Sequence, residues 1–258
     1  MSAEYLAFAH ELADRAGEVL KQHYRSSVAV DYKADASPVT IADRGAERAM
    51  RELIGTQFPD HGVEGEEFSS EQGGAEFVWS LDPIDGTKAF VIGRPTFGTL
   101  IGLLRHGKPV LGIIDQCILG ERWAGASGEK STHNGAGIGV RECPGLSHAV
   151  VCATAPEMFK TEDDAAAFRR VAQTARFPVY GGDCYSYGLL AMGFADLIVE
   201  ASLDLHDFAA LVPVIEGAGG IITDWHGRPL KKGSDGRVVA AGDRRVHQET
   251  LALLATAS

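Results

Sequence analysis

Long apolar runs, zinc-type cysteine pairs and a surplus of positive charge are all missing from this sequence. The four Cys form no CxxC pair, which favours free thiols in a reducing compartment. No apolar run approaches the ~18 residues of a membrane helix, and charges interrupt residues 1–22, so we expect a cytoplasmic protein without a membrane partner. With 24 basic and 35 acidic side chains, the formal charge of −11 argues against a nucleic-acid partner. An anionic substrate would need local compensation, for example by bound cations.

The composition that remains is that of an ordinary globular protein. Hydrophobic residues make up 45% and charged residues 23% of the 258 positions, which suits one large domain or two fused lobes. Glycine is abundant at 31 residues, well above the usual ~7%, which indicates many tight turns and close backbone contacts.

The spacing of apolar residues predicts two different halves. Helices over 6–20 and from Thr40 to Pro59, the second with a Thr40/Asp43 capping box, accompany strands at 77–81, 98–104, 110–115 and 121–124. Strands at 149–153, 197–200, 221–223 and 238–241 then alternate with helices at 163–175, 184–192, 207–218 and 244–255. We expect an α+β lobe with an antiparallel sheet over residues 1–143 and an α/β lobe over 144–258, divided at Pro144.

A turn rich in carboxylates follows the predicted strand at 77–81. Asp82 and Asp85 stand three residues apart, between the rigid Pro83 and the permissive Gly86. Such a turn can aim both carboxylates at one point, and they repel each other unless a cation lies between them. Oxygen ligands at this density suit Mg²⁺ or Mn²⁺, and the Ile84 carbonyl is a further candidate. A strand-ending Asx turn is the alternative interpretation.

Other acidic positions widen this pattern. Glu66, in Gly65-Glu66-Glu67, precedes the strand and is otherwise a solvated surface acid. Asp207 stands before an apolar helix, where it is an N-cap, a ligand or both. If Thr87 begins a helix, its free N–H groups favour an anion beside the metals, which indicates metal-assisted phosphoester hydrolysis. Asp43 either accepts a hydrogen bond from Thr87, which would orient an attacking water, or only completes the capping box.

Together these segments resemble the inositol monophosphatase superfamily. The resemblance rests on 65–67, on Trp79 with 82–87, and on Asp207-x-Ala209-Ala210 followed by 218–220, and it covers nearly the whole chain. It implies a layered αβαβα fold, usually in a homodimer, and a Mg²⁺-dependent, lithium-sensitive phosphatase that acts on a small phosphorylated substrate. Mn²⁺ is a possible substitute for Mg²⁺.

The resemblance also implies a set of metal ligands. Glu66, Asp82 and the Ile84 carbonyl would bind one metal. Asp82, Asp85 and Asp207 would bind a second, and Glu66 would help to hold a weaker third. In the proposed two-lobe division, the first lobe thus carries most ligands, and the second supplies Asp207 and the substrate-side residues.

Catalytic and phosphate-binding roles follow in the same way. Thr87, with Asp43 behind it and Glu66 nearby, would activate the water. Gly86 and Thr87 would contribute backbone contacts to the phosphate. Lys33 matches a basic position of the family.

Two further segments resemble the histidinol-phosphate phosphatases of this superfamily, which act in histidine biosynthesis. They are 85–90 with 95–100, and 181–185. Histidinol phosphate carries a cationic amine and an imidazole. Glu200 stands at the family's substrate-contacting position, and Asp183 would add a second anion on the leaving-group side. Alternatively, Asp183 caps the helix that begins near Cys184.

Several alternatives stay open at this stage. The family often has Trp where His206 precedes Asp207. His206 either supports the ligand Asp207 from behind or packs or faces solvent, and we expect the latter. Other phosphatase functions are inositol monophosphatase, a broad sugar-phosphate phosphatase and a nucleotide 3′-phosphatase. A non-catalytic regulatory protein with the same fold is a further alternative, against which the complete acidic set argues.

Overall fold

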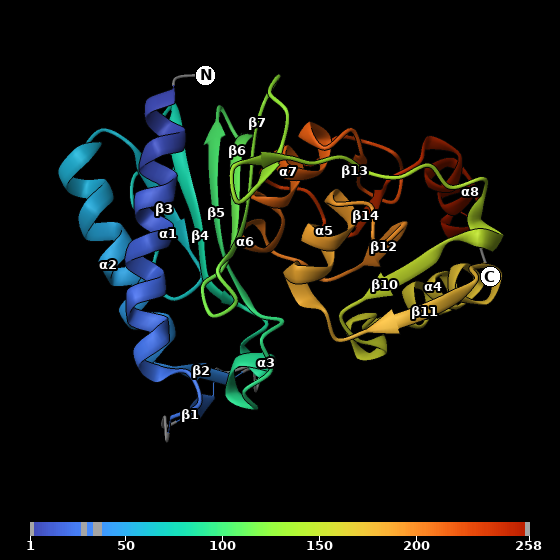
Figure 1. Ribbon diagram of the computed structural model, residues 1–258, viewed down its shortest axis with the longest axis horizontal. Coiled ribbons are helices and arrows are strands. Elements are labelled where there is room, and N and C mark those ends of the chain that lie inside the picture. The colour runs from blue at the N-terminus through green and yellow to red at the C-terminus, as the bar shows by residue number, and fades with distance from the viewer. Residues whose placement is uncertain (1–2, 27–29, 33–37, 256–258) are drawn as a thin grey trace.

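The computed structural model describes residues 3–26, 30–32 and 38–255, which form alternating layers of helix and sheet (Figure 1). α1 (Ala3–His23) and α2 (Ile41–Gln57) cover one face of a seven-stranded sheet. α5 (Asp183–Ala191), α6 (Leu205–Phe208) and α7 (Leu211–Gly217) lie between this sheet and a five-stranded one. α4 (Glu162–Thr174) and α8 (Arg244–Leu254) lie on the far side. The predicted αβαβα sandwich is therefore confirmed.

The larger sheet is antiparallel except for its first pair of strands. Its strands follow chain order: β3 (Gly62–Gly65), β4 (Phe77–Asp85), β5 (Gly98–Arg105), β6 (Lys108–Gln116), β7 (Glu121–Ala126), β8 (Thr132–His133) and β9 (Ala136–Gly137). β3 runs parallel to β4, so both strands end at the same edge of the sheet. This shared edge brings Glu66 and Asp82 together.

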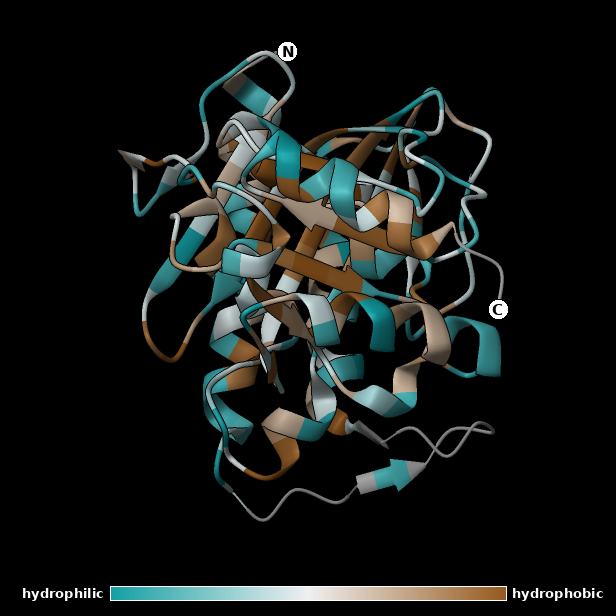
Figure 2. Cartoon of the chain, turned by 90° about the vertical axis from the view of Figure 1, so that its right-hand side faces the viewer, coloured by the Kyte–Doolittle hydropathy of each residue, from teal (hydrophilic) through white to brown (hydrophobic). Residues whose placement is uncertain are grey.

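The smaller sheet is mixed. Its order is β11 (Phe177–Tyr180), β10 (Val150–Ala153), β12 (Leu197–Glu200), β14 (Val238–Ala241) and β13 (Ile221–Thr223). The remaining elements are β1 (Val30–Tyr32) paired with β2 (Pro38–Thr40), α3 (Thr87–Val91), and the short 3₁₀ turns η1 (Leu146–His148) and η2 (Pro156–Met158). Figure 2 shows the apolar strand segments toward the middle of the molecule, with polar turns outside them.

A row of glycines seats α6 and α7 on the larger sheet. Gly102, Gly112 and Gly125 lie side by side across β5, β6 and β7. A Cβ on Gly112 would overlap with the Ala210 carbonyl, and one on Gly125 would overlap with the Pro213 carbonyl. The missing side chains allow the segment after Asp207 to approach the strands closely, which fixes that carboxylate over the sheet edge.

Most predicted elements are present, with differences that have local causes. The predicted helix at 207–218 is two helices, because Pro213 has no N–H to continue a helix from α6 into α7. β11 was not predicted: it lies at the sheet edge and contains Pro178, which edge strands tolerate. β4 continues through Asp85, with an irregular register between Asp82 and Asp85.

The two sheets occupy separate parts of the chain, yet the second half also contributes to the first sheet's packing. α6 and α7 lie against β5, β6 and β7. The division at Pro144 into residues 1–143 and 144–258 stays a prediction. The basic position Lys33 lies outside the described residues.

Candidate active site

Three carboxylates from distant parts of the chain meet at the edge of the larger sheet. Asp82, Asp85 and Asp207 each place a carboxylate oxygen within 4.8 Å of the others. Asp82 is 2% exposed, whereas Asp207 keeps 20% of its side chain exposed. Burial, and then the negative charges around them, raise the pKa values of Asp82 and Asp85 well above the usual range, and that of Asp207 to a lesser degree. A cation between them would remove this repulsion.

The local backbone explains why β4 can present two carboxylates. The Ile84 N–H donates to Asp82 Oδ1 at 3.0 Å. The N–H of Cys184, in the first turn of α5, donates to Asp85 Oδ2 at 2.6 Å. Gly86 follows in the left-handed region, with φ of 83°, and ends the strand. Each carboxylate therefore has one oxygen fixed by a backbone N–H.

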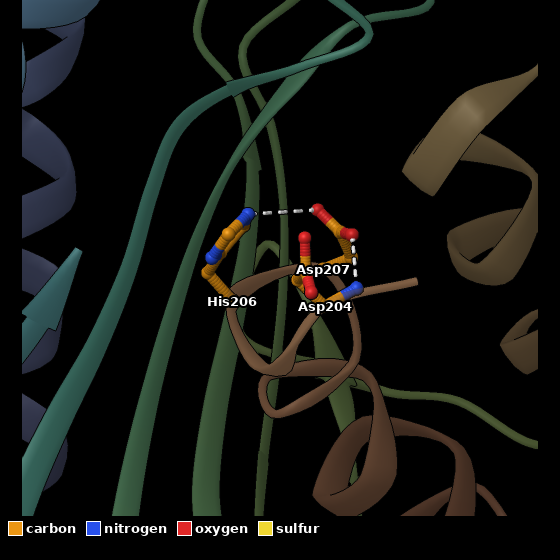
Figure 3. Close-up of side chains that lie close together, drawn as sticks. All are labelled: Asp204, His206 and Asp207. Atoms are coloured by element: carbon orange, nitrogen blue, oxygen red, sulfur yellow. Dashed lines mark hydrogen bonds and ion pairs between the residues drawn. The ribbon is translucent and has the colours of Figure 1, made fainter. Parts of the chain in front are cut away.

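Asp207 is oriented by a capping box at the start of α6 (Figure 3). Asp204, which is the N-cap, donates its N–H to Asp207 Oδ2 at 2.7 Å. Asp207 is thus the third residue of the helix rather than its N-cap. His206 Nε2 lies 3.5 Å from Asp207 Oδ1, so His206 contacts a candidate ligand instead of simply facing solvent.

Glu66 follows β3 and lies beside this cluster. Its N–H donates to the Leu81 carbonyl at 3.1 Å. Its side chain forms a hydrogen bond with Asp82, and its charge contributes to the raised pKa values of Asp82, Asp43 and Asp207. Glu66 therefore lies close enough to Asp82, Asp43 and Asp207 for its charge to act on all three.

Thr87 and Asp43 lie at the starts of α3 and α2. The Thr87 hydroxyl donates to the Ile84 carbonyl at 3.0 Å. Asp43 Oδ2 accepts from the Thr40 N–H at 2.7 Å and from its hydroxyl at 2.6 Å, which confirms the predicted capping box. Asp43 Oδ1 is buried and has no hydrogen-bond partner among the described residues. Among the described residues, Thr87 and Asp43 form no hydrogen bond with each other. The catalytic roles of Thr87 and Asp43 stay predictions.

Asp183 and Glu200 line the same cavity as two of the cluster carboxylates. The cavity has a volume of about 120 Å³ and also contacts Asp85, Asp207 and Tyr187. Two larger cavities, of about 570 and 560 Å³, are lined by other residues and contain none of these carboxylates. The small cavity, where these acidic side chains converge, is therefore the candidate active site.

Glu200 is buried and held from two elements. Its Oε1 accepts from the Thr154 hydroxyl at 2.6 Å and N–H at 2.9 Å, and its Oε2 accepts from the Tyr187 hydroxyl at 2.9 Å. Burial raises the pKa of Glu200 to about 7, although these hydrogen bonds oppose the shift. Sequence analysis missed Thr154 and Tyr187, since only the fold brings them to Glu200.

Asp183 is not a helix cap, so that alternative is wrong. Gly182 is the N-cap of α5, without a side-chain cap bond. Asp183 itself has φ of 44°, and its Cγ would lie 2.9 Å from a Cβ placed on Gly86. Burial raises the pKa of Asp183 to about 6, while the charges of Arg94 and Lys88 oppose the shift.

The layered fold brings together, at one sheet edge, carboxylate oxygens of the kind that hold a divalent cation in metal-dependent hydrolases. Comparison with known proteins then gives the family: the model of the inositol monophosphatase family matches residues 1–258. The chain belongs to the inositol monophosphatase family and is a phosphatase of that family. The family generally uses Mg²⁺.

The names of individual relatives refer to two different substrates. The protein named bifunctional phosphatase IMPL2, chloroplastic, from Arabidopsis thaliana is 49% identical over 256 residues, which cover 96% of this chain and 74% of that protein. A histidinol-phosphatase from Chlorobaculum parvum is 35% identical, covering 91% of each chain. The structure of an inositol monophosphatase from Zymomonas mobilis matches with a TM-score of 0.91 at 46% identity, over 99% of this chain and 100% of that one.

Within the described ranges, no helix has both the length and the apolar character that a membrane span requires.

Proposed function

We propose that this chain is a Mg²⁺-dependent phosphomonoester hydrolase whose substrate is histidinol phosphate. The observation that carries the proposal is the convergence of Asp82, Asp85 and Asp207. Among the described residues, none of these carboxylates forms an ion pair with Arg or Lys, and His206 beside Asp207 is their one basic contact. Oxygen-only donors that repel one another when buried fit Mg²⁺, and Mn²⁺ as a substitute.

Two groups of residues would hold the metal ions. Glu66, Asp82 and the Ile84 carbonyl would bind one, and Asp82, Asp85 and Asp207 a second, with Glu66 contributing to a third. When bound, Mg²⁺ neutralises phosphate charge and lowers the pKa of water. The Ile84 carbonyl already accepts from Thr87 and has a second lone pair for a ligand bond.

The chain's own residues would orient the water and receive its proton. The Thr87 hydroxyl would hold the attacking water, with Glu66 accepting a proton from it. Asp43 supports this role because its Oδ1 is buried with no partner in the described part of the chain, leaving it able to accept a hydrogen bond. The backbone at Gly86 and Thr87 would contact the phosphate.

The choice of histidinol phosphate rests on the acidic leaving-group side of the cavity. Glu200 and Asp183 both line it, and a cationic imidazole or amine would be attracted to them. Relatives named histidinol-phosphatase support the same choice. Inositol 1-phosphate is the second candidate, favoured by the likeness to the Zymomonas mobilis inositol monophosphatase.

The test is the ratio of kcat/KM for histidinol phosphate to that for inositol 1-phosphate. We expect the wild type to prefer histidinol phosphate, and Glu200→Gln to reduce the preference by ~10- to 100-fold, since a charge-assisted hydrogen bond contributes roughly 1.5–3 kcal/mol. Asp183→Asn should act in the same direction. A wild-type preference for inositol 1-phosphate, or a ratio that Glu200→Gln leaves unchanged, would reject the histidinol phosphate assignment.

From the family resemblance we also propose a homodimer and inhibition by lithium, and from the charged N-terminal segment and the lack of long apolar runs a cytoplasmic location. Light scattering on the purified chain tests the first, and phosphate release in the presence of LiCl tests the second.

A further inference from the structure

Glu47 is a buried carboxylate beside the candidate active site that the proposed mechanism does not use. It lies on α2, one turn after Asp43, and it is fully buried. Its Oε1 accepts from Arg51 Nε at 2.8 Å, and its Oε2 accepts from the Glu67 N–H at 2.8 Å. Because its charge is balanced by Arg51, Glu47 differs from Asp82, Asp85 and Asp207, none of which pairs with an Arg or Lys of the described ranges.

Glu47 contacts both neighbours of Glu66 in the chain, Gly65 and Glu67. The residue before it, Gly65, comes so close that a Cβ there would overlap with the Glu47 carboxylate. The residue after it, Glu67, donates its N–H to the same carboxylate. On the opposite side, Glu66 donates its own N–H to Leu81 of β4. The backbone around Glu66 is thus held on one side by strand β4 and on the other by the Glu47 side chain of α2.

Arg51 extends this support along the loop. Its Nη2 donates to the Phe68 carbonyl at 3.2 Å, and its Nη1 pairs with Glu71 at 2.9 Å. Arg51 is 10% exposed at its side chain, and its guanidinium lies 5.8 Å from the centre of the Phe68 ring. One turn of α2 separates Asp43 from Glu47 and another separates Glu47 from Arg51, so all three lie on one face of the helix.

We propose that Glu47 and Arg51 are positioning residues that hold the segment 65–68 against α2 and so fix Glu66 for metal binding. The inference rests on the proposed metal-dependent function. A carboxylate is required because the Arg51 Nε–H and the Glu67 N–H are two donors that need acceptors at one place. Groups that hydrogen-bond directly to a metal ligand typically contribute 10- to 100-fold to metal affinity. We expect the lower end of this range, because Glu47 and Arg51 hold the backbone around Glu66.

The test is Mg²⁺ binding to the metal-free protein, measured by calorimetry. Glu47→Gln preserves the shape but turns an NH₂ group toward one of the two donors. We expect its Kd for Mg²⁺ to rise about tenfold, and the Mg²⁺ concentration for half-maximal activity to rise with it, while kcat at saturating Mg²⁺ recovers.

Asp196→Asn is the matched control. Asp196 is also a buried carboxylate that accepts from an arginine, Arg141 at 2.6 Å, and from a backbone N–H, that of Val150 at 2.8 Å. It lies before β12, at the other end of that strand from Glu200. We expect Asp196→Asn to lower Tm and to leave the Kd for Mg²⁺ unchanged.

The outcomes separate this inference from the proposed function. If Glu47→Gln lowers Tm as the control does, with wild-type affinity for Mg²⁺, the positioning role is wrong and the proposed function stands. If the wild type binds no Mg²⁺, the proposed function fails and this inference fails with it. Should Glu47→Gln not fold, Arg51→Lys replaces it, because Lys can pair with Glu47 but has no second nitrogen for Phe68. An unchanged Kd in Arg51→Lys would also overturn the inference.

Discussion

Buried carboxylates occur in two kinds of surroundings in this protein. Asp196 and Asp82 are both 2% exposed. Asp196 forms two bonds of 2.6 Å with Arg141. Asp82 instead lies among Asp85, Asp207 and Glu66, whose charges raise its pKa after burial has already done so.

The difference shows which carboxylates serve the fold and which serve a ligand. An arginine partner compensates a buried carboxylate within the chain, so folding alone satisfies it. Among the described residues, no Arg or Lys pairs with the cluster at the end of β4, where each carboxylate accepts a backbone N–H on one oxygen and His206 contacts only Asp207. Such a site costs stability unless a cation binds, which is how a functional carboxylate cluster differs from a structural ion pair.

Removing one cluster charge should have the largest effect on activity. We expect Asp85→Asn and Asp207→Asn each to lower kcat/KM by about 10³-fold or more, because a metal ion contributes several kcal/mol to the transition state. Both variants should stay folded, and the metal-free forms should melt above the metal-free wild type because like-charge repulsion falls. Steady-state kinetics and thermal unfolding in EDTA check both parts. Near-normal rates, or unfolding of the variants, would contradict the assigned roles.

The next largest effect should come from the hydroxyl beside the cluster. Thr87→Ala should lower kcat by ~10²-fold, at the lower end of what positioned proton-transfer groups contribute. Thr87→Ser should keep most of the activity, since the hydroxyl can still donate to the Ile84 carbonyl. Equal losses in both variants would assign Thr87 to packing through its methyl group.

A pH titration sharpens the comparison on the side of stability. Since the folded-state pKa values of Asp82 and Asp85 are raised, and that of Glu200 is raised to about 7, the folded protein retains protons that the unfolded chain releases. The free energy of unfolding of the metal-free protein should therefore fall as the pH rises from about 5 to about 7. Mg²⁺ should remove most of this fall. Urea unfolding with EDTA or Mg²⁺ measures it, and a metal-free stability that rises over this range would refute the assignment.

The smallest effect concerns the seat of Asp207. Gly112→Ala would place a methyl group against the Ala210 carbonyl and should cost ~1–3 kcal/mol of stability, with weaker Mg²⁺ binding as α6 shifts. Gly74→Ala, where a Cβ meets no atom within 4 Å, is the control and should behave as wild type. The two variants are compared by urea unfolding and by calorimetric titration with Mg²⁺. Equal stability in both would show that the glycine row tolerates side chains.

Residues close in sequence were the predictable part of the site. Asp82, Asp85 and Gly86 share one turn, and the Thr40/Asp43 box is a local motif, so both followed from spacing. The contacts of Glu200 with Thr154 and Tyr187 depend on the pairing of β10 with β12 and on the packing of α5. Asp183 was open to a capping interpretation because Asp before a helix is common. The carboxylate that does accept an N–H from the first turn of α5 is Asp85, bonded to Cys184, and it is remote in sequence. Pro213 itself is a local signal for the break between α6 and α7.

The most direct test of the account is phosphate release from histidinol phosphate by protein that has been stripped with EDTA and then titrated with Mg²⁺. If the carboxylates at the end of β4 converge because they hold divalent cations, the stripped protein is inactive, and Mg²⁺ restores activity in a saturable way. Phosphate release that persists in excess EDTA would contradict the account.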